Sequence, residues 1–205
     1  MRKLILSLLL ILPASAVAQA DCNGFPIVTF SGWSGEMAAL RHGFCVQDET
    51  GALYWQDGLP DWNSHNQMPV YFQTRAIWQS RGVIEQTAAL NGVDLTPFDG
   101  AVALNSCALV GSTVYVRQNA SERWIEVVVA DCVKREHLEY HTVAMESGIE
   151  LQWELAEALG VTTHINEWGG VGMYGFEVCL GLPMVDCIGA PVDYTDWYLE
   201  HVRYE

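Results

Sequence analysis

The feature that most constrains this chain is a β-branched run that ends at a carboxylate beside a cysteine. Residues 125–130 read Ile-Glu-Val-Val-Val-Ala, and Asp131 and Cys132 follow directly. Because valine and isoleucine are stiff at χ1 and fit a pleated surface, we expect a strand that is buried on at least one face. Asp131 should mark its end. The fold must therefore include a sheet built around this segment.

Neighbouring segments predict further strands, so the chain should be mainly β. Strand-like patterning begins near Val70, Val102 and Val114, the last of these after a glycine turn at Gly111. A final strand is expected to begin at Phe176.

Two stretches have helical spacing. Across residues 75–91, apolar side chains recur as on one face of a helix, with an interruption at Gly82 and an end at Asn91-Gly92. Across residues 152–159 the leucines lie four apart, and Gly160 follows as a C-cap. A helix as short as the second one is not stable alone, so it must pack on the strands.

The first twenty residues have the pattern of a secretory signal. Arg2 and Lys3 precede an apolar run, and Ala18-Gln-Ala20 is the small-x-small pattern of a cleavage site. We therefore predict a signal peptide over residues 1–20 and an exported product. Asp21 stands where a lipoprotein signal needs a small residue, which argues against a lipid anchor.

The net charge narrows the range of partners. Loss of Arg2 and Lys3 leaves eight basic residues against 25 acidic ones, so the formal charge of the mature chain is 8 − 25 = −17. Such a surface repels nucleic acid and anionic lipid, because binding phosphates requires cations. Neutral glycans and cationic ligands remain open. Beyond residue 20, no apolar run approaches the ~20 residues of a membrane helix.

The chain has six cysteines, and all of them follow the predicted cleavage site. An even number in an exported chain favours disulfides, although six cysteines allow 15 connectivities. We predict local pairing, as Cys22–Cys45, Cys107–Cys132 and Cys179–Cys187, and we expect the second of these bonds to join two neighbouring strands. No two cysteines have the C-x-x-C spacing of a zinc ribbon or a redox motif.

Two further patterns each allow two interpretations. His137 and His141 would share one face of a helix, as metal ligands do, but the metalloprotease pattern needs glutamate where Leu138 stands, so we expect a chance pair and no metal. The second pattern is a set of tryptophans in the amino-terminal segment, Trp33, Trp55 and Trp62. They could form a sugar-stacking surface, although tryptophans more often serve core or turn packing.

The order of the central motifs resembles a known family. Asp99-Gly-Ala-Val-Ala-Leu, Gly111-Ser-Thr-Val-Tyr-Val, Val127-Val-Val-Ala-Asp-Cys and Gly148-Ile-Glu-Leu follow one another, and a helix comes next. This succession is similar to the double-psi β-barrel of the rare-lipoprotein-A-like, expansin and barwin group. The resemblance implies a mainly β fold, with a six-stranded double-psi β-barrel and one or two short helices. The barrel should span residues 67–178, between small disulfide-closed extensions at residues 21–66 and 179–205.

The resemblance also implies a site. The family's groove aspartate corresponds to Asp131 and its second acid to Glu150, so these two are the candidate catalytic residues. Asn105 stands where lytic-transglycosylase members have a histidine. We expect Tyr71 and Asn105 on the groove wall, and His137 or His141 from the connecting loop, as ligand-binding residues.

Both acids also have structural interpretations. A carboxylate at Glu150 would suit the start of the following helix, where the helix dipole favours negative charge. Asp131 could instead accept hydrogen bonds from turn amides.

Two functions fit the resemblance. The first is a secreted protein that binds or remodels a cell-wall or extracellular glycan without cleaving it. The second is a glycoside-cleaving enzyme, of the lytic transglycosylase or endoglucanase type, with Asp131 as the key acid. In both cases the expected partner is a polysaccharide or a peptidoglycan-like glycan, and we expect no cofactor, no nucleic acid, no membrane association after signal cleavage, and a monomer.

Overall fold

A computed structural model describes most of the chain. The described residues are 22, 27–29, 40–48, 50–58, 68–120, 122–163 and 172–202. The predicted signal peptide, Trp33 and Trp62 lie outside them. Within these ranges no helix is long and apolar enough to cross a membrane.

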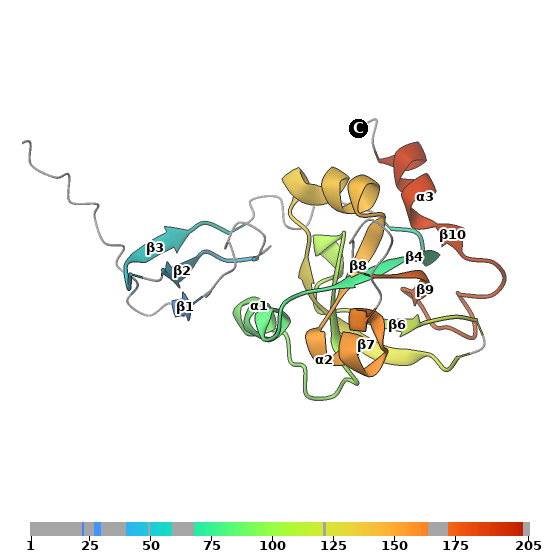
Figure 1. Ribbon diagram of the computed structural model, residues 1–205, viewed down its shortest axis with the longest axis horizontal. Coiled ribbons are helices and arrows are strands. Elements are labelled where there is room, and N and C mark those ends of the chain that lie inside the picture. The colour runs from blue at the N-terminus through green and yellow to red at the C-terminus, as the bar shows by residue number, and fades with distance from the viewer. Residues whose placement is uncertain are drawn as a thin grey trace, which may run out of the picture.

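Six strands close into a β-barrel, as predicted (Figure 1). They are β4 (Tyr71–Trp78), β5 (Ala101–Leu104), β6 (Thr113–Arg117), β7 (Ile125–Cys132), β8 (Ser147–Leu151) and β9 (Met173–Cys179). The order around the barrel is β4-β8-β5-β7-β6-β9, and β9 pairs back onto β4. The pairs β4–β8 and β5–β7 are parallel, while the remaining four pairings are antiparallel.

Alternation along the strands fills the barrel with aliphatic side chains. In β7, Val127 and Val129 belong to the main core, whereas Val128 and Ala130 pack against the helix outside. Each fully buried aliphatic side chain contributes about 1.5–3 kcal/mol, which is why a run of valines can hold this strand in place. The predicted strand around Val127 is confirmed.

The helices lie outside the barrel. Helix α1 (Val83–Asn91) places Ile84 and Ala88 against the outer faces of β5 and β7. The helix predicted over residues 152–159 is α2 (Trp153–Ala158), and Leu155 packs toward the main core. Three short 3₁₀ helices are η1 (Cys107–Leu109), η2 (Arg135–His137) and η4 (Val161–Thr163), and η3 (Tyr140–Ala144) is a π-helix.

One secondary-structure prediction was wrong. Residues 75–78 belong to β4 and not to a helix that begins at residue 75, and α1 starts only at Val83, after Gly82 in the left-handed region. The physical reason is pairing on both edges: Ala76 lies between Ile149 of β8 and Met173 of β9. Such tertiary pairing overrides a local apolar spacing that suits either structure.

The amino-terminal extension forms a small sheet of its own. Strands β1 (Ile27–Thr29), β2 (Phe44–Gln47) and β3 (Leu53–Gln56) make a three-stranded sheet, and in Figure 1 it lies on the opposite side of α1 from the barrel. Phe44 and Leu40 are buried with Leu90 of α1 packed against them. The sheet therefore contacts the barrel domain through this helix.

The carboxy-terminal segment joins the barrel. Strand β10 (Val192–Asp193) pairs with the start of β4, and helix α3 (Tyr194–His201) follows, capped by the Asp193 side chain. The Tyr194 ring is part of the main core and packs on Phe72. The predicted carboxy-terminal extension thus packs against β4 and covers that part of the barrel.

All three predicted disulfides are present: Cys22–Cys45, Cys107–Cys132 and Cys179–Cys187. The Cα atoms of the second pair are 4.9 Å apart, within the range that a disulfide spans. We expected this bond to join two neighbouring strands, but it joins the η1 turn to the end of β7. Three disulfides are compatible with an extracellular location.

Candidate functional site

The two predicted acids meet on the outward-facing side of the barrel sheet, where the rest of the chain buries them. Asp131 of β7 and Glu150 of β8 both lie opposite Ala103 of β5, one on each side. Glu150 stands between Ile149 and Leu151, whose side chains point into the core, so its own side chain points outward. Their positions on strands that flank β5 bring the two carboxylates to one face of the sheet.

A β-bulge turns Asp131 toward this face. Val102 pairs with Val129, but the next residue of β5, Ala103, pairs with Asp131, so Ala130 is an extra residue in β7. Without it, Asp131 would point inward like Val129. Bulges redirect side chains in this manner, and they are common next to active sites.

The amide of Gln79 connects the two acids. Its Nε2 atom donates to Oε2 of Glu150 at 2.6 Å and lies 3.3 Å from Oδ2 of Asp131. One nitrogen therefore holds both carboxylates, and since it is 2.6 Å from one oxygen and 3.3 Å from the other, the two acids are close enough for their charges to interact. Gln79 follows β4 directly, so the end of a third strand fixes this contact.

Asp131 is held from a second direction. Its Oδ1 atom accepts a hydrogen bond of 2.7 Å from the backbone N–H of Cys132. The residue is fully buried. A carboxylate in this position has fixed geometry but no surface that a ligand could touch directly.

His141 supplies a third titratable group. Its Nδ1 atom lies 3.0 Å from Oε1 of Glu150, close enough for an ion pair when the imidazole is protonated. The direction of approach is not that of a hydrogen bond, and Nδ1 makes none within the described part of the chain. We give the name acidic cluster to Gln79, Asp131, His141 and Glu150.

A pocket opens beside the acidic cluster. It has a volume of about 180 Å³. Its polar lining comes from Gln79, Ser80, His137, His141 and Glu150, and its apolar lining from Ile77, Trp78, Cys132, Val133 and Met145. Two of the predicted ligand-binding residues, His137 and His141, thus share this pocket with Glu150, while Asp131 lies behind Gln79.

The two histidines lie in successive short helices of different type. His137 ends η2 and His141 lies in the π-helix η3, and both side chains line the pocket. Within the described ranges, no group of three or more histidine, cysteine or acidic side chains could hold a metal ion.

Asn105 takes part in a different network. It is buried, and its Nδ2 atom donates to Oγ1 of Thr142 at 2.9 Å and to the carbonyl of Ser147 at 3.0 Å. These contacts hold η3 against β8. Asn105 is not among the residues that line the pocket.

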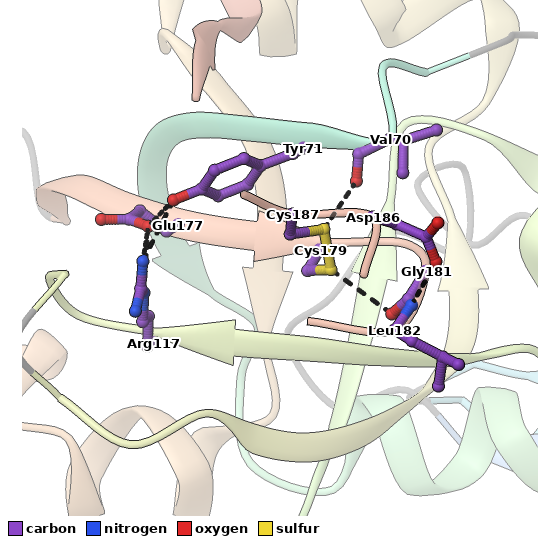
Figure 2. Close-up of a disulfide and its surroundings, with 9 residues drawn as sticks. All are labelled: Val70, Tyr71, Arg117, Glu177, Cys179, Gly181, Leu182, Asp186 and Cys187. Atoms are coloured by element: carbon purple, nitrogen blue, oxygen red, sulfur yellow. Dashed lines mark hydrogen bonds and ion pairs between the residues drawn. A yellow bond between two sulfur atoms is a disulfide. The ribbon is translucent and has the colours of Figure 1, made fainter. Parts of the chain in front are cut away.

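Tyr71 lies at the start of β4, while the acidic cluster lies at its end. Its hydroxyl donates to Glu177 and accepts from Nη2 of Arg117 at 3.0 Å (Figure 2). Arg117 also donates to Oε2 of Glu177, from Nη2 at 2.6 Å and from Nε at 3.0 Å, and stacks over Trp124. We call Tyr71, Arg117 and Glu177 the arginine cluster. The structure does not bring Tyr71 to the predicted groove.

The helix-dipole interpretation of Glu150 does not hold. Glu150 is in β8, and its carboxylate is bound by Gln79 and lies against His141. The acid in the first turn of α2 is Glu154. The side chain of Glu150 thus serves the pocket and not the helix end.

Sequence reasoning missed Gln79 altogether. A glutamine after a predicted strand carries no chemical signal. Gln79 belongs to the site because it contacts Asp131 and Glu150, which follow it in the chain by 52 and 71 positions. Trp78 and Met145 were missed for the same reason. Comparison of the chain with family models, with curated proteins and with solved structures found no match.

Proposed function

We propose that this protein is exported and binds or remodels a neutral extracellular glycan at the pocket beside Glu150. We further propose that its barrel is of the double-psi type. The closed six-stranded order with parallel β4–β8 and β5–β7 pairs supports that type. The predicted signal peptide and the three disulfides support export.

The observation that carries the proposal is the position of Glu150. Its carboxylate reaches the pocket wall, where it is held by Gln79 beside the buried Asp131. Carboxylates accept hydrogen bonds and do not donate them, so they suit a ligand rich in hydroxyl donors. The apolar wall of Ile77, Trp78 and Met145 suits the C–H faces of a sugar ring.

Pocket size and charge limit the ligand further. Ordinary small-molecule sites have about 300–1,000 Å³, so this smaller pocket would hold a single sugar unit of a longer chain. The excess of acidic over basic residues disfavours strongly anionic polymers. Neutral polysaccharides meet both conditions.

Cleavage of a glycosidic bond is the second candidate function, and the acidic cluster favours it. Glu150 would protonate the leaving oxygen as a general acid, because it is the carboxyl group that reaches the pocket. Asp131 would act through Gln79 and by its charge, which stabilises a cationic transition state. As the glycosidic bond breaks, water or a hydroxyl of the sugar itself would add to the anomeric carbon, and its proton would return to Glu150 directly or by way of His141. In this arrangement Glu150 is the key acid, and not Asp131 as the resemblance implied.

The test is turnover and retention of the purified protein on cellulose, chitin, β-glucan and peptidoglycan. Retention without soluble fragments supports the binding function, and release of fragments supports cleavage. Glu150→Gln should weaken either one, whereas Glu157→Gln on the exposed face of α2 is the matched control. Absence of both retention and release on all four polymers would exclude the proposal.

A further inference from the structure

Two side chains of the pocket beside Glu150 have acceptor oxygens that the described part of the chain leaves without a donor. The Oε2 atom of Glu150 accepts from Gln79 at 2.6 Å, whereas no described residue donates to its Oε1 atom. The Oε1 atom of Gln79 is buried and has no hydrogen-bond partner among the described residues. Buried acceptors without a partner are rare, and each one needs an explanation.

The imidazole of His141 is a third polar group of this pocket. Its side chain is only 3% exposed, yet it lines the pocket, and Nδ1 makes no hydrogen bond within the described ranges. Nδ1 lies 3.0 Å from Oε1 of Glu150. A neutral imidazole has one nitrogen that accepts a hydrogen bond, and a carboxylate oxygen only accepts. A ligand that has several donors on one atom suits such a set of acceptors.

The wall of the pocket also lacks a fixed positive charge. Among the described residues that line it, none is lysine or arginine, and Lys134, which follows the lining residue Val133, is not one of them. Over the whole chain, acidic residues outnumber basic ones by 25 to 10. Such an excess raises the local concentration of cations. Both the pocket and the chain as a whole therefore favour a positively charged group.

We propose that the pocket binds the primary ammonium group of an amino sugar. An ammonium has three N–H donors and no acceptor, which is the complement of a wall made of acceptors. A guanidinium is less suited, because it pairs best with both oxygens of a carboxylate, and Gln79 already occupies Oε2 of Glu150. The apolar side chains of Ile77, Val133 and Met145 would contact the C–H groups of the sugar ring.

This inference rests on the proposed glycan function and specifies one unit of the ligand. That unit is an amino sugar whose amine is free and not acetylated, within a polymer that is otherwise neutral. Acetylation turns the ammonium into an uncharged amide with a single N–H donor, so it removes the feature that the pocket would recognise. Free and acetylated forms of one oligosaccharide therefore provide a direct test.

The experiment measures the binding of three hexasaccharides to the full chain by titration calorimetry, at low ionic strength and below the pKa of the sugar amines. The three are a glucosamine oligomer, its N-acetylated form and cellohexaose. The glucosamine oligomer should bind about tenfold tighter than the other two, because hydrogen bonds between charged groups are stronger. Glu150→Gln should remove this advantage. Glu157→Gln deletes the same charge from the exposed face of α2 and should keep it. Cadaverine, an alkylamine without a sugar, should compete only weakly.

The outcomes separate this inference from the proposed function. If the two neutral oligomers bind as tightly as the glucosamine oligomer, the inference is wrong and the proposed function stands. That comparison uses wild type alone, so it decides even if Glu150→Gln does not fold. If Glu157→Gln weakens amine binding as much as Glu150→Gln does, overall charge and not the pocket attracts the amine, and the inference is again wrong. If no oligomer binds, the proposed function fails and the inference fails with it.

Discussion

The arginine cluster and the acidic cluster are both buried and polar, yet they differ in charge balance. In the arginine cluster, the Glu177 carboxylate faces a guanidinium at 2.6 Å, and the side chains of Arg117 and Glu177 are only 14% and 8% exposed. In the acidic cluster, Asp131 and Glu150 share one neutral amide, and among its four described residues His141 is the one that can become cationic.

The difference in charge balance suggests different roles for the arginine cluster and the acidic cluster. A paired, well hydrogen-bonded ion pair holds elements together and has no need of a ligand. Two acids on one amide repel each other and retain capacity to accept hydrogen bonds, and Glu150 opens onto a pocket. We therefore expect the arginine cluster to contribute to stability, and we propose ligand binding for the acidic cluster.

The largest expected effect tests the first half of this assignment. Glu177→Ala should lower the free energy of unfolding by about 3–5 kcal/mol, because it leaves the buried charge of Arg117 unpaired. Urea denaturation measures it. Glu177→Gln keeps an acceptor and should cost less, and both variants should retain glycan binding while folded. If Glu177→Ala lowers the free energy of unfolding by less than about 1 kcal/mol, the Arg117–Glu177 pair contributes no more than a surface ion pair, and the expectation is wrong.

Glu150→Gln tests the second half. Glycan binding or cleavage should fall about 100-fold, because the amide cannot carry the charge or transfer the proton. The free energy of unfolding should change by no more than about 1 kcal/mol, since the oxygen of the new amide can still accept from Gln79. Glu157→Gln should match wild type in both measurements. Unchanged binding in Glu150→Gln would remove this residue from the mechanism.

The sequence was informative where one local pattern determines the structure. The valine run predicted β7, leucine spacing and Gly160 predicted α2, and all three cysteine pairings were correct. Asp131 and Glu150 were chosen as partners from a resemblance, and the structure does bring them together around Gln79.

The sequence was uninformative where position depends on strand register. Residues 75–78 have an apolar spacing that suits a helix, and only pairing with β8 and β9 makes them strand. Tyr71 is the first residue of β4, and Gln79 comes directly after its last residue. The two ends of one strand therefore contribute to different clusters. No local pattern distinguishes these two ends.

Asp131→Asn should have an intermediate effect on stability. Both carboxylate oxygens face donors, the N–H of Cys132 and the amide of Gln79, so an introduced amide group must place a donor against a donor. A mismatch of this kind in a fully buried position costs about 1–3 kcal/mol. Denaturation and glycan binding should be measured on the same folded sample. Full stability with lost activity would instead assign Asp131 to the chemistry and not to holding the turn.

Tyr71→Phe should have the smallest effect, and pH gives it a distinct signature. At neutral pH the loss of two hydrogen bonds, to Glu177 and from Arg117, should cost about 1 kcal/mol and leave glycan binding unchanged. Burial, together with the bond to Glu177, raises the pKa of Tyr71 above its ordinary value of 10.0.

The sign of the pH effect follows from this shift. Above pH 10 the unfolded chain releases a proton that the folded chain retains, so wild-type stability falls as pH rises through that range. Tyr71→Phe lacks this contribution, whereas buried Tyr194, whose pKa burial also raises, remains in both proteins. Urea denaturation of the two proteins from pH 8 to 11 should therefore show their difference in free energy shrinking above pH 10. A difference that stays constant with pH would mean that the Tyr71 hydroxyl is not held by the arginine cluster.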